Sequence, residues 1–243
     1  MTEIINMKVK YINWRQILHK PLTSIARLVL KHKVRLVRND YLFNGKPIIY
    51  TITHVFKDDI ASILCCLQNN AYVLVGNAVR KSFDGFVIWL NGVILVDRSD
   101  KASRAIAKEK MVAYLRQGDD VLIAPEATHN FTPNLLVMKL WWGLLDVARI
   151  ADANIVPVAV DLVNDEYCVI IGESFHYIQY SDKTEAIESL REVMATMIWE
   201  LYEMKPKAKR ADVSEEQFSA YINGELARMP YSDLEYENNF IRT

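Results

Sequence analysis

The chain of 243 residues is 51% hydrophobic and 24% charged, with a formal net charge of -1 at pH 7. These proportions exclude a disordered or fibrous protein, and the length suffices for one large domain with a substantial core. We expect no signal peptide, and no apolar stretch approaches the roughly 20 residues of a membrane-spanning helix, so any membrane role is expected to be peripheral.

The first 39 residues carry an excess of positive charge. They hold nine Lys or Arg against the acidic residue Glu3, which gives a local charge of +8. Apolar residues from Trp14 to Leu30 interleave with these cations, which is typical of a basic amphipathic segment on an anionic membrane surface. An ordinary solvated helix face is the alternative. We expect no nucleic-acid partner, because no recognition motif accompanies the basic residues.

Short β-rich runs alternate with longer helical patterns in the rest of the chain, which predicts an α/β fold. Most of the β-rich runs are continuously apolar, so we expect the strands to be buried on both faces. The predicted strands cover residues 47–52, 71–77, 86–90, 92–97, 120–125, 154–162 and 167–175.

Helical patterns separate these strands. Asp100 is a predicted N-cap and Gly118 a predicted helix stop. After Met204 the composition becomes polar, which predicts a helical tail that is appended or part of the same domain. The predicted helices cover residues 58–68, 100–118, 138–153 and 181–204, and the predicted organisation is a basic amphipathic segment (1–40), a main domain (41–205) and a polar helical tail (206–243).

Cysteine usage indicates a reducing compartment. The chain has three cysteines, two of them adjacent at Cys65 and Cys66, and this odd number does not make a disulfide framework. We therefore expect a cytoplasmic protein, peripheral on the cytoplasmic face of a membrane.

The stretch YTITHVFKDDIAS, residues 50 to 62, places His54 in the turn between a predicted strand and a predicted helix. That edge of an α/β sheet is where ligands usually bind. A carboxylate in the first turn of the helix can hold the imidazole while His54 removes a proton from an alcohol. Asp58 and Asp59 are both candidates, and either can instead be a helix cap. A core histidine at a strand end is the alternative reading of His54.

Three further segments place distinctive residues in or after predicted strands. Arg98 follows one strand, and its permanently charged guanidinium suits phosphate or carboxylate. The stretch VLIAPEATHN ends another strand with Glu126, Thr128 and His129. The stretch NIVPVAV places Pro157 inside a strand, where its missing donor is tolerated only at an edge or a bulge.

In this order, the four segments resemble the glycerolipid acyltransferase family. The first block of that family, His-x4-Asp, matches His54 and Asp59. The second, Gly-x-Ile-x-Ile-x-Arg, is similar to residues 92–98. The third, Phe-Pro-Glu-Gly-Thr-Arg-Ser, is similar to residues 124–130, and the fourth, Val-Pro-Val, matches residues 156–158.

The resemblance covers roughly residues 45–175 and implies a mixed, mostly parallel central sheet flanked by helices. It implies an enzyme that moves a fatty acyl chain from an acyl thioester, acyl-CoA or acyl carrier protein, to a hydroxyl of a lysophospholipid or glycerol phosphate. In this reading His54 is the general base, Asp59 orients it and Asp58 is the cap. No cofactor is implied, and no metal is expected because the five histidines are scattered without ligand spacing. The residues implied in substrate binding are Gly92, Arg98, Glu126, Thr128 and His129.

Departures from the family pattern mean that the sequence does not fix the chemical class of the acceptor. Ala127 stands where the pattern has glycine, which predicts a different loop path because alanine does not easily adopt a positive φ. His129 stands where the pattern has arginine, and imidazole is neither always charged nor bidentate. The acceptor is therefore either a phosphate held by Arg98 with weaker help from His129, or a different hydroxylated or amino-bearing precursor. A catalytically weak, membrane-associated homologue and a hydrolase that uses the same His–Asp pair are the alternative functions.

Overall fold

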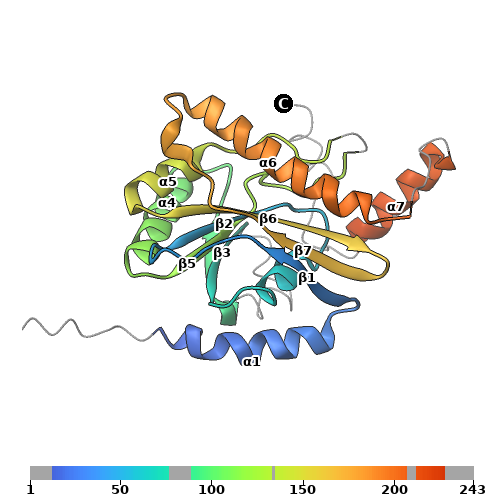
Figure 1. Ribbon diagram of the computed structural model, residues 1–243, viewed down its shortest axis with the longest axis horizontal. Helices are drawn as coiled ribbons and strands as arrows, with labels where there is room; N and C mark the ends of the chain where they lie inside the picture. Colours follow the sequence, from blue (N-terminus) through green and yellow to red (C-terminus); the bar gives the residue numbers. More distant parts are fainter. Residues whose placement is uncertain (1–12, 77–88, 133–134, 207–211, 228–243) are drawn as a thin grey trace, which may run out of the picture.

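The computed structural model describes residues 13–76, 89–132, 135–206 and 212–227. A seven-stranded sheet with the order β1-β7-β6-β2-β5-β3-β4 forms its centre (Figure 1). Neighbouring strands are parallel except for β6 with β7, so the sheet is mixed and mostly parallel, as predicted. The strands are β1 (Lys33–Asn39), β2 (Ile48–Ile52), β3 (Ala71–Gly76), β4 (Val93–Val96), β5 (Asp120–Ile123), β6 (Asn154–Val163) and β7 (Glu166–Ile171).

Helices cover both faces of the sheet (Figure 1). Each face has its own apolar core, with Leu145 and Leu190 fully buried on one side and Ile52 and Ile63 on the other. Burial of one such side chain stabilises the fold by about 1.5–3 kcal/mol. None of the helices in the described part of the chain has the length and apolar character needed to cross a bilayer. One face carries α4 (Lys101–Arg116), α5 (Gly143–Ala151) and α6 (Lys183–Glu203); the other carries α2 (Asp59–Leu64) with α1 (Trp14–Val29) packed over it; α7 (Glu215–Ala227) follows α6.

The ends of α4 follow from its sequence. The Asp100 carboxylate accepts hydrogen bonds from the backbone N–H groups of Ala102 and Ser103 at 3.1 and 2.9 Å. Gly118 lies just past the helix with a φ of +88°, and its N–H donates to the carbonyl of Leu115 at 2.9 Å. The predicted cap and the predicted stop are both confirmed.

Several predicted elements need correction. The helix predicted over 138–153 begins only at Gly143, and the strand predicted over 167–175 ends at Ile171. The basic segment forms a helix only to Val29, and residues 33–39 form β1, an edge strand that pairs with β7. Most of β1 is exposed, so its sequence lacks the continuous apolar run of a buried strand. Trp89 and Leu90, at the end of a predicted strand, are helical. Residues 1–12, 77, 86–88, 207–211 and 228–243 of the predicted elements lie outside the described residues.

Pro157 lies in β6, which is a central strand. Its ladder with β7 begins at the pair of Val158 with Ile171, so the missing donor of Pro157 falls beyond the end of that ladder. On the other side, Pro157 stays in register with Thr51 of β2. The central strand tolerates proline because its neighbour ends there.

Candidate active site

Three of the predicted site segments meet at one edge of the sheet. His54, Arg98 and Glu126 follow the carboxyl ends of β2, β4 and β5. These strands belong to one parallel group with β3, so their carboxyl ends lie at the same edge. Ligands of open α/β sheets bind at this edge.

His54 and Asp59 form a directly bonded pair. Nδ1 of His54 lies 2.8 Å from Oδ2 of Asp59, and the carboxylate is fully buried. The same oxygen accepts the backbone N–H groups of Val55 and Phe56 at 2.9 and 3.2 Å, which fixes the turn between β2 and α2. Because Nδ1 is occupied, Nε2 is the nitrogen left for proton transfer.

Opposing effects set the pKa of the His54 imidazole. Burial lowers it, while the charge and the hydrogen bond of Asp59 raise it, and the net result is a raised pKa. The positive charge of Arg98 acts in the lowering direction, so its guanidinium is near enough to influence the ring. His54 is 12% exposed, so the pair is shielded from bulk water and still reachable.

The Glu126 carboxylate supports the backbone around His54. Oε1 accepts the N–H of His54 at 3.2 Å and Oε2 accepts the N–H of Met138 at 2.8 Å. Burial raises the pKa of Glu126 to about 7, against the lowering effect of these two bonds. Both oxygens face the backbone of this chain, whereas the resemblance implied a contact with the acceptor. The connection to Met138 could not be read from the sequence.

The turn after Glu126 keeps a glycine-like conformation at Ala127, whose φ is +63°. The expectation that alanine would avoid this region is wrong, and the conformation costs roughly 1–2 kcal/mol. Hydrogen bonds hold the segment just before Ala127: Oε2 of Glu126 accepts the N–H of Met138 at 2.8 Å, and the carbonyl of Pro125 accepts the N–H of Trp141 at 2.9 Å. Thr128 is buried, and its hydroxyl has no hydrogen-bond partner among the described residues.

His129 lies against His54. The ring centroids of His54 and His129 are 3.7 Å apart, with 31° between the ring planes. The next residue, Asn130, donates its N–H to the carbonyl of His54 at 2.7 Å. The sequence showed Asn130 only as a departure from the family pattern. Its Oδ1 accepts the N–H of Thr132 at 3.1 Å, an asparagine turn that the residue type alone favours.

Gly92 lies away from these residues. It precedes β4, so it is at the edge of the sheet opposite to Arg98. Its φ is +115°, and a Cβ atom there would lie 2.9 Å from the ring of Tyr72. Close packing against Tyr72 therefore requires this glycine, and the length of β4 separates it from Arg98 at the other end of the strand.

Asp58 has a different contact from the predicted one. It occupies the N-cap position of α2, but its side chain makes no capping hydrogen bond. Instead it accepts a hydrogen bond from the hydroxyl of Tyr167 at 3.3 Å. The carboxylate thus ties the turn after β2 to β7.

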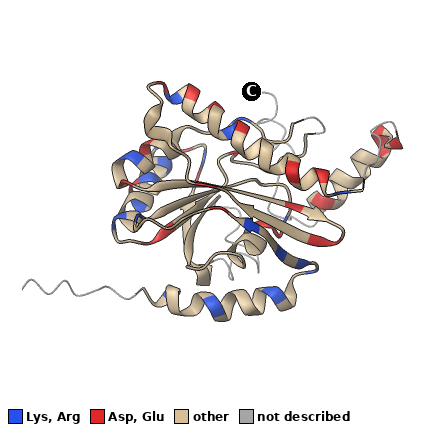
Figure 2. Ribbon diagram, in the orientation of Figure 1, with Lys and Arg blue, Asp and Glu red and all other residues tan. Residues whose placement is uncertain are grey.

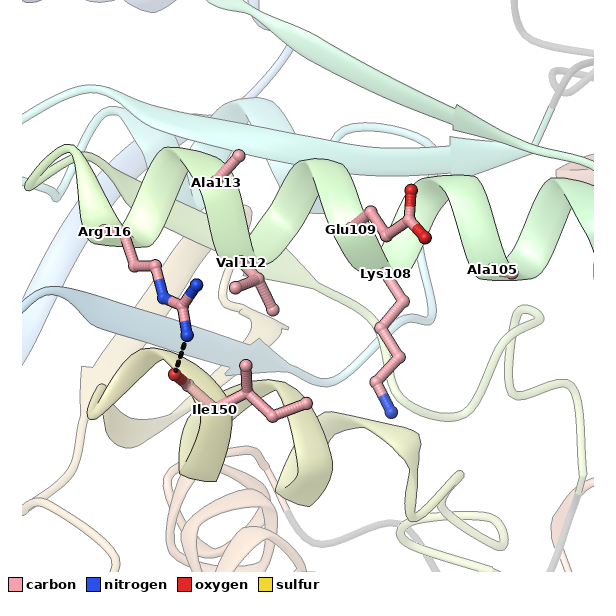
Figure 3. Close-up of a pocket in the computed structure, with 7 residues that line it drawn as sticks. All are labelled: Ala105, Lys108, Glu109, Val112, Ala113, Arg116 and Ile150. Atoms are coloured by element: carbon pink, nitrogen blue, oxygen red, sulfur yellow. Dashed lines mark hydrogen bonds between the residues drawn. The ribbon is translucent and has the colours of Figure 1, made fainter.

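Two surface hollows lie apart from the His54–Asp59 pair. One, of about 420 Å³, lies between α4 and α5, where Arg116 donates to the carbonyl of Ile150 at 3.0 Å (Figure 3). The other, of about 470 Å³, is lined by residues of β1, α6 and the segment after β7. Neither includes a predicted site residue, so the candidate site is defined by side-chain geometry at the sheet edge.

Comparison with known proteins identifies a family and a shared fold. The model of the Acyltransferase family matches residues 33–161. Eight chains of solved structures match. Among them is the crystal structure of the 1-acyl-sn-glycerophosphate (LPA) acyltransferase PlsC from Thermotoga maritima, with 17% sequence identity and a TM-score of 0.63 over 79% of this chain and 83% of that chain. No curated protein sequence matches significantly. The likeness to the solved structure shows a shared fold.

Proposed function

We propose, since the chain belongs to the acyltransferase family, that it transfers a fatty acyl chain from an acyl thioester to a hydroxyl of a lysophospholipid or glycerol phosphate. The observation that carries this proposal is the buried Asp59 carboxylate, 2.8 Å from Nδ1 of His54 at the ligand-binding edge of the sheet. Acyl-CoA and acyl carrier protein present the same thioester, and either serves this chemistry.

In the proposed mechanism, His54 is the general base. Nε2 takes the proton of the acceptor hydroxyl while the hydroxyl oxygen attacks the thioester carbonyl carbon. The tetrahedral intermediate collapses with cleavage of the C–S bond, and the imidazolium returns its proton to the departing thiolate. Asp59 holds the tautomer and balances the charge of the imidazolium. General-base catalysis contributes about 10²- to 10⁴-fold.

The position of Arg98 favours an acceptor that carries a phosphate. Its charge acts on His54, and its side chain is half-buried. Within the described residues, the guanidinium has no hydrogen bond and no ion pair. A guanidinium near the base can bind phosphate with two parallel hydrogen bonds, which places the acceptor hydroxyl beside the imidazole.

The surface of α1 supports peripheral membrane association, which we propose for the cytoplasmic face. Trp14, Ile17, Ile25 and Leu28 recur on one side of the helix and are 43–85% exposed. Lys and Arg residues occur on α1 and along β1, as the blue segments of the ribbon show (Figure 2). An exposed apolar stripe with basic residues beside it fits an anionic bilayer surface. The lipid acceptor would then meet the enzyme at the membrane.

Thiol release from palmitoyl-CoA, with and without lysophosphatidic acid or glycerol-3-phosphate, tests the proposed reaction. Release that requires the acceptor supports transfer. Release without any acceptor indicates hydrolysis, and no release with any acceptor from CoA or carrier-protein donors indicates a homologue that has lost the activity.

A further inference from the structure

The ring of His129 covers the imidazole of the proposed base. Its centroid is 3.7 Å from that of His54, and the planes are tilted by 31°. The His129 residue is only 5% exposed. Its ring is therefore placed to contact the base and is poorly placed to meet an acceptor arriving from solvent.

The backbone around His129 holds this contact in place. Glu126 accepts the N–H of His54 at 3.2 Å, and Asn130 donates to the carbonyl of the same residue at 2.7 Å. The segment on either side of His129 thus binds both backbone polar groups of His54. The Phe131 ring lies 5.7 Å from the His129 ring, with 14° between their planes, and extends the stack.

We propose that His129 is a positioning residue for His54 and not a ligand of the acceptor. Its ring fixes the imidazole plane, so that Nδ1 stays on Asp59 and Nε2 faces the acceptor hydroxyl. This inference rests on the proposed function, in which His54 is the base.

Charged groups near His54 bear on what can occupy the position of His129. Among the described residues, the acidic groups Asp59 and Glu126 and the basic group Arg98 act on His54. Asp59 makes its bond to His54, so the imidazolium forms on that ring. A second positive charge about 4 Å away would oppose protonation of the base. A neutral aromatic face, by contrast, attracts a cation placed over it.

Substitutions of His129 separate positioning from acceptor binding. His129→Phe keeps a flat ring without a charge, and we expect it to lower kcat less than His129→Ala, which removes the ring and should lower kcat about tenfold, with the acceptor KM within about threefold of wild type in both variants. His129→Arg puts a permanent charge beside the base, and we expect kcat to fall at least about tenfold, with the acid limb of the pH–rate profile moved to lower pH. If His129 instead held the acceptor phosphate, arginine would lower the KM for lysophosphatidic acid and phenylalanine would raise it. That pair of results would overturn the proposal.

A measurement without substrate keeps the inference testable if the proposed function fails. In NMR titrations, the Cε1–H signal of His54 is assigned by its loss in His54→Ala. We expect its midpoint to be lower in His129→Arg than in wild type and to change little in His129→Phe. An unchanged midpoint in His129→Arg would contradict the stack. If the wild-type protein shows no thiol release with any donor and acceptor, the proposed function is wrong. The titration would still show whether the residue at position 129 influences the pKa of His54.

Discussion

Glu126 accepts the backbone N–H of His54 at 3.2 Å, although the two residues are 72 positions apart in the sequence. The turn after β5 therefore holds the turn after β2. The other carboxylate oxygen of Glu126 accepts the N–H of Met138 at 2.8 Å, so one buried carboxylate joins its own turn, the His54 turn and the segment at Met138. The position of His54 depends on Glu126 as well as on Asp59.

Glu126→Gln tests this supporting role. A carboxamide offers one acceptor and one donor, so one of the two backbone N–H groups loses its partner. We expect a loss of about 1–3 kcal/mol in the free energy of unfolding and a lower kcat, measured by urea denaturation and steady-state kinetics. Glu109→Gln, on the exposed side of α4, is the matched control and should change neither. A variant with normal kcat and a raised acceptor KM would favour acceptor binding instead.

Asp59→Asn tests the pH dependence of the base. In the proposed mechanism His54 acts only when neutral, and Asp59 raises its pKa, so the acid limb of wild-type kcat/KM should lie above the ordinary histidine value of about 6.5. Without that carboxylate, burial dominates and the pKa of His54 falls. We expect kcat/KM to drop by about 10²–10⁴ and the acid limb to move to lower pH, in rates measured from pH 5 to 9. Asp58→Asn should leave the limb in place, and an unmoved limb in Asp59→Asn would count against the pair.

Ala127→Gly tests the strained turn. Glycine removes the penalty of roughly 1–2 kcal/mol for the left-handed region and loses part of that gain to the greater freedom of the unfolded chain. We expect a gain of up to about 1 kcal/mol in the free energy of unfolding, measured by urea denaturation. Ala113→Gly, at an exposed position inside α4, should lose about 1 kcal/mol. Equal losses in both variants would contradict strain at Ala127.

The α1 stripe is tested by liposome flotation. We expect wild type to float with anionic liposomes and to bind less at high salt. Ile17→Glu combined with Leu28→Glu puts charges on the apolar stripe and should abolish flotation. Ile178 is also strongly exposed, at 74%, and lies outside α1, so Ile178→Glu should float normally. Flotation of the double variant at the wild-type level would show that α1 is not the anchor.

The buried strands were predictable because each is a short apolar run, which can be recognised without knowing its neighbours in the sheet. β2 to β7, apart from small shifts at their ends, lie where those runs occur. β1 was missed because six of its seven residues are exposed, and only pairing with β7 makes it a strand. An edge strand of this kind is defined by its neighbour and leaves little trace in its own sequence.

The sequence predicted which residues gather at the carboxyl ends of the strands better than it predicted what those residues contact. The order of the motifs predicted that His54, Asp59, Arg98 and Glu126 lie at one edge of the sheet. The carboxylate of Glu126, however, binds backbone N–H groups whose positions depend on the whole fold. Gly92 belongs to the same motif as Arg98, yet β4 separates the two residues. The spacing of motif residues along a strand does not show which of them lie at the carboxyl end of that strand, where the candidate site is.

The most direct measurement is acceptor-dependent thiol release by His54→Ala, compared with wild type and with His176→Ala as a control for an exposed histidine outside the site. We expect His176→Ala to match wild type and His54→Ala to lose at least about 100-fold in rate. Transfer by His54→Ala at the wild-type rate would contradict the account, because the base would then have to be another group.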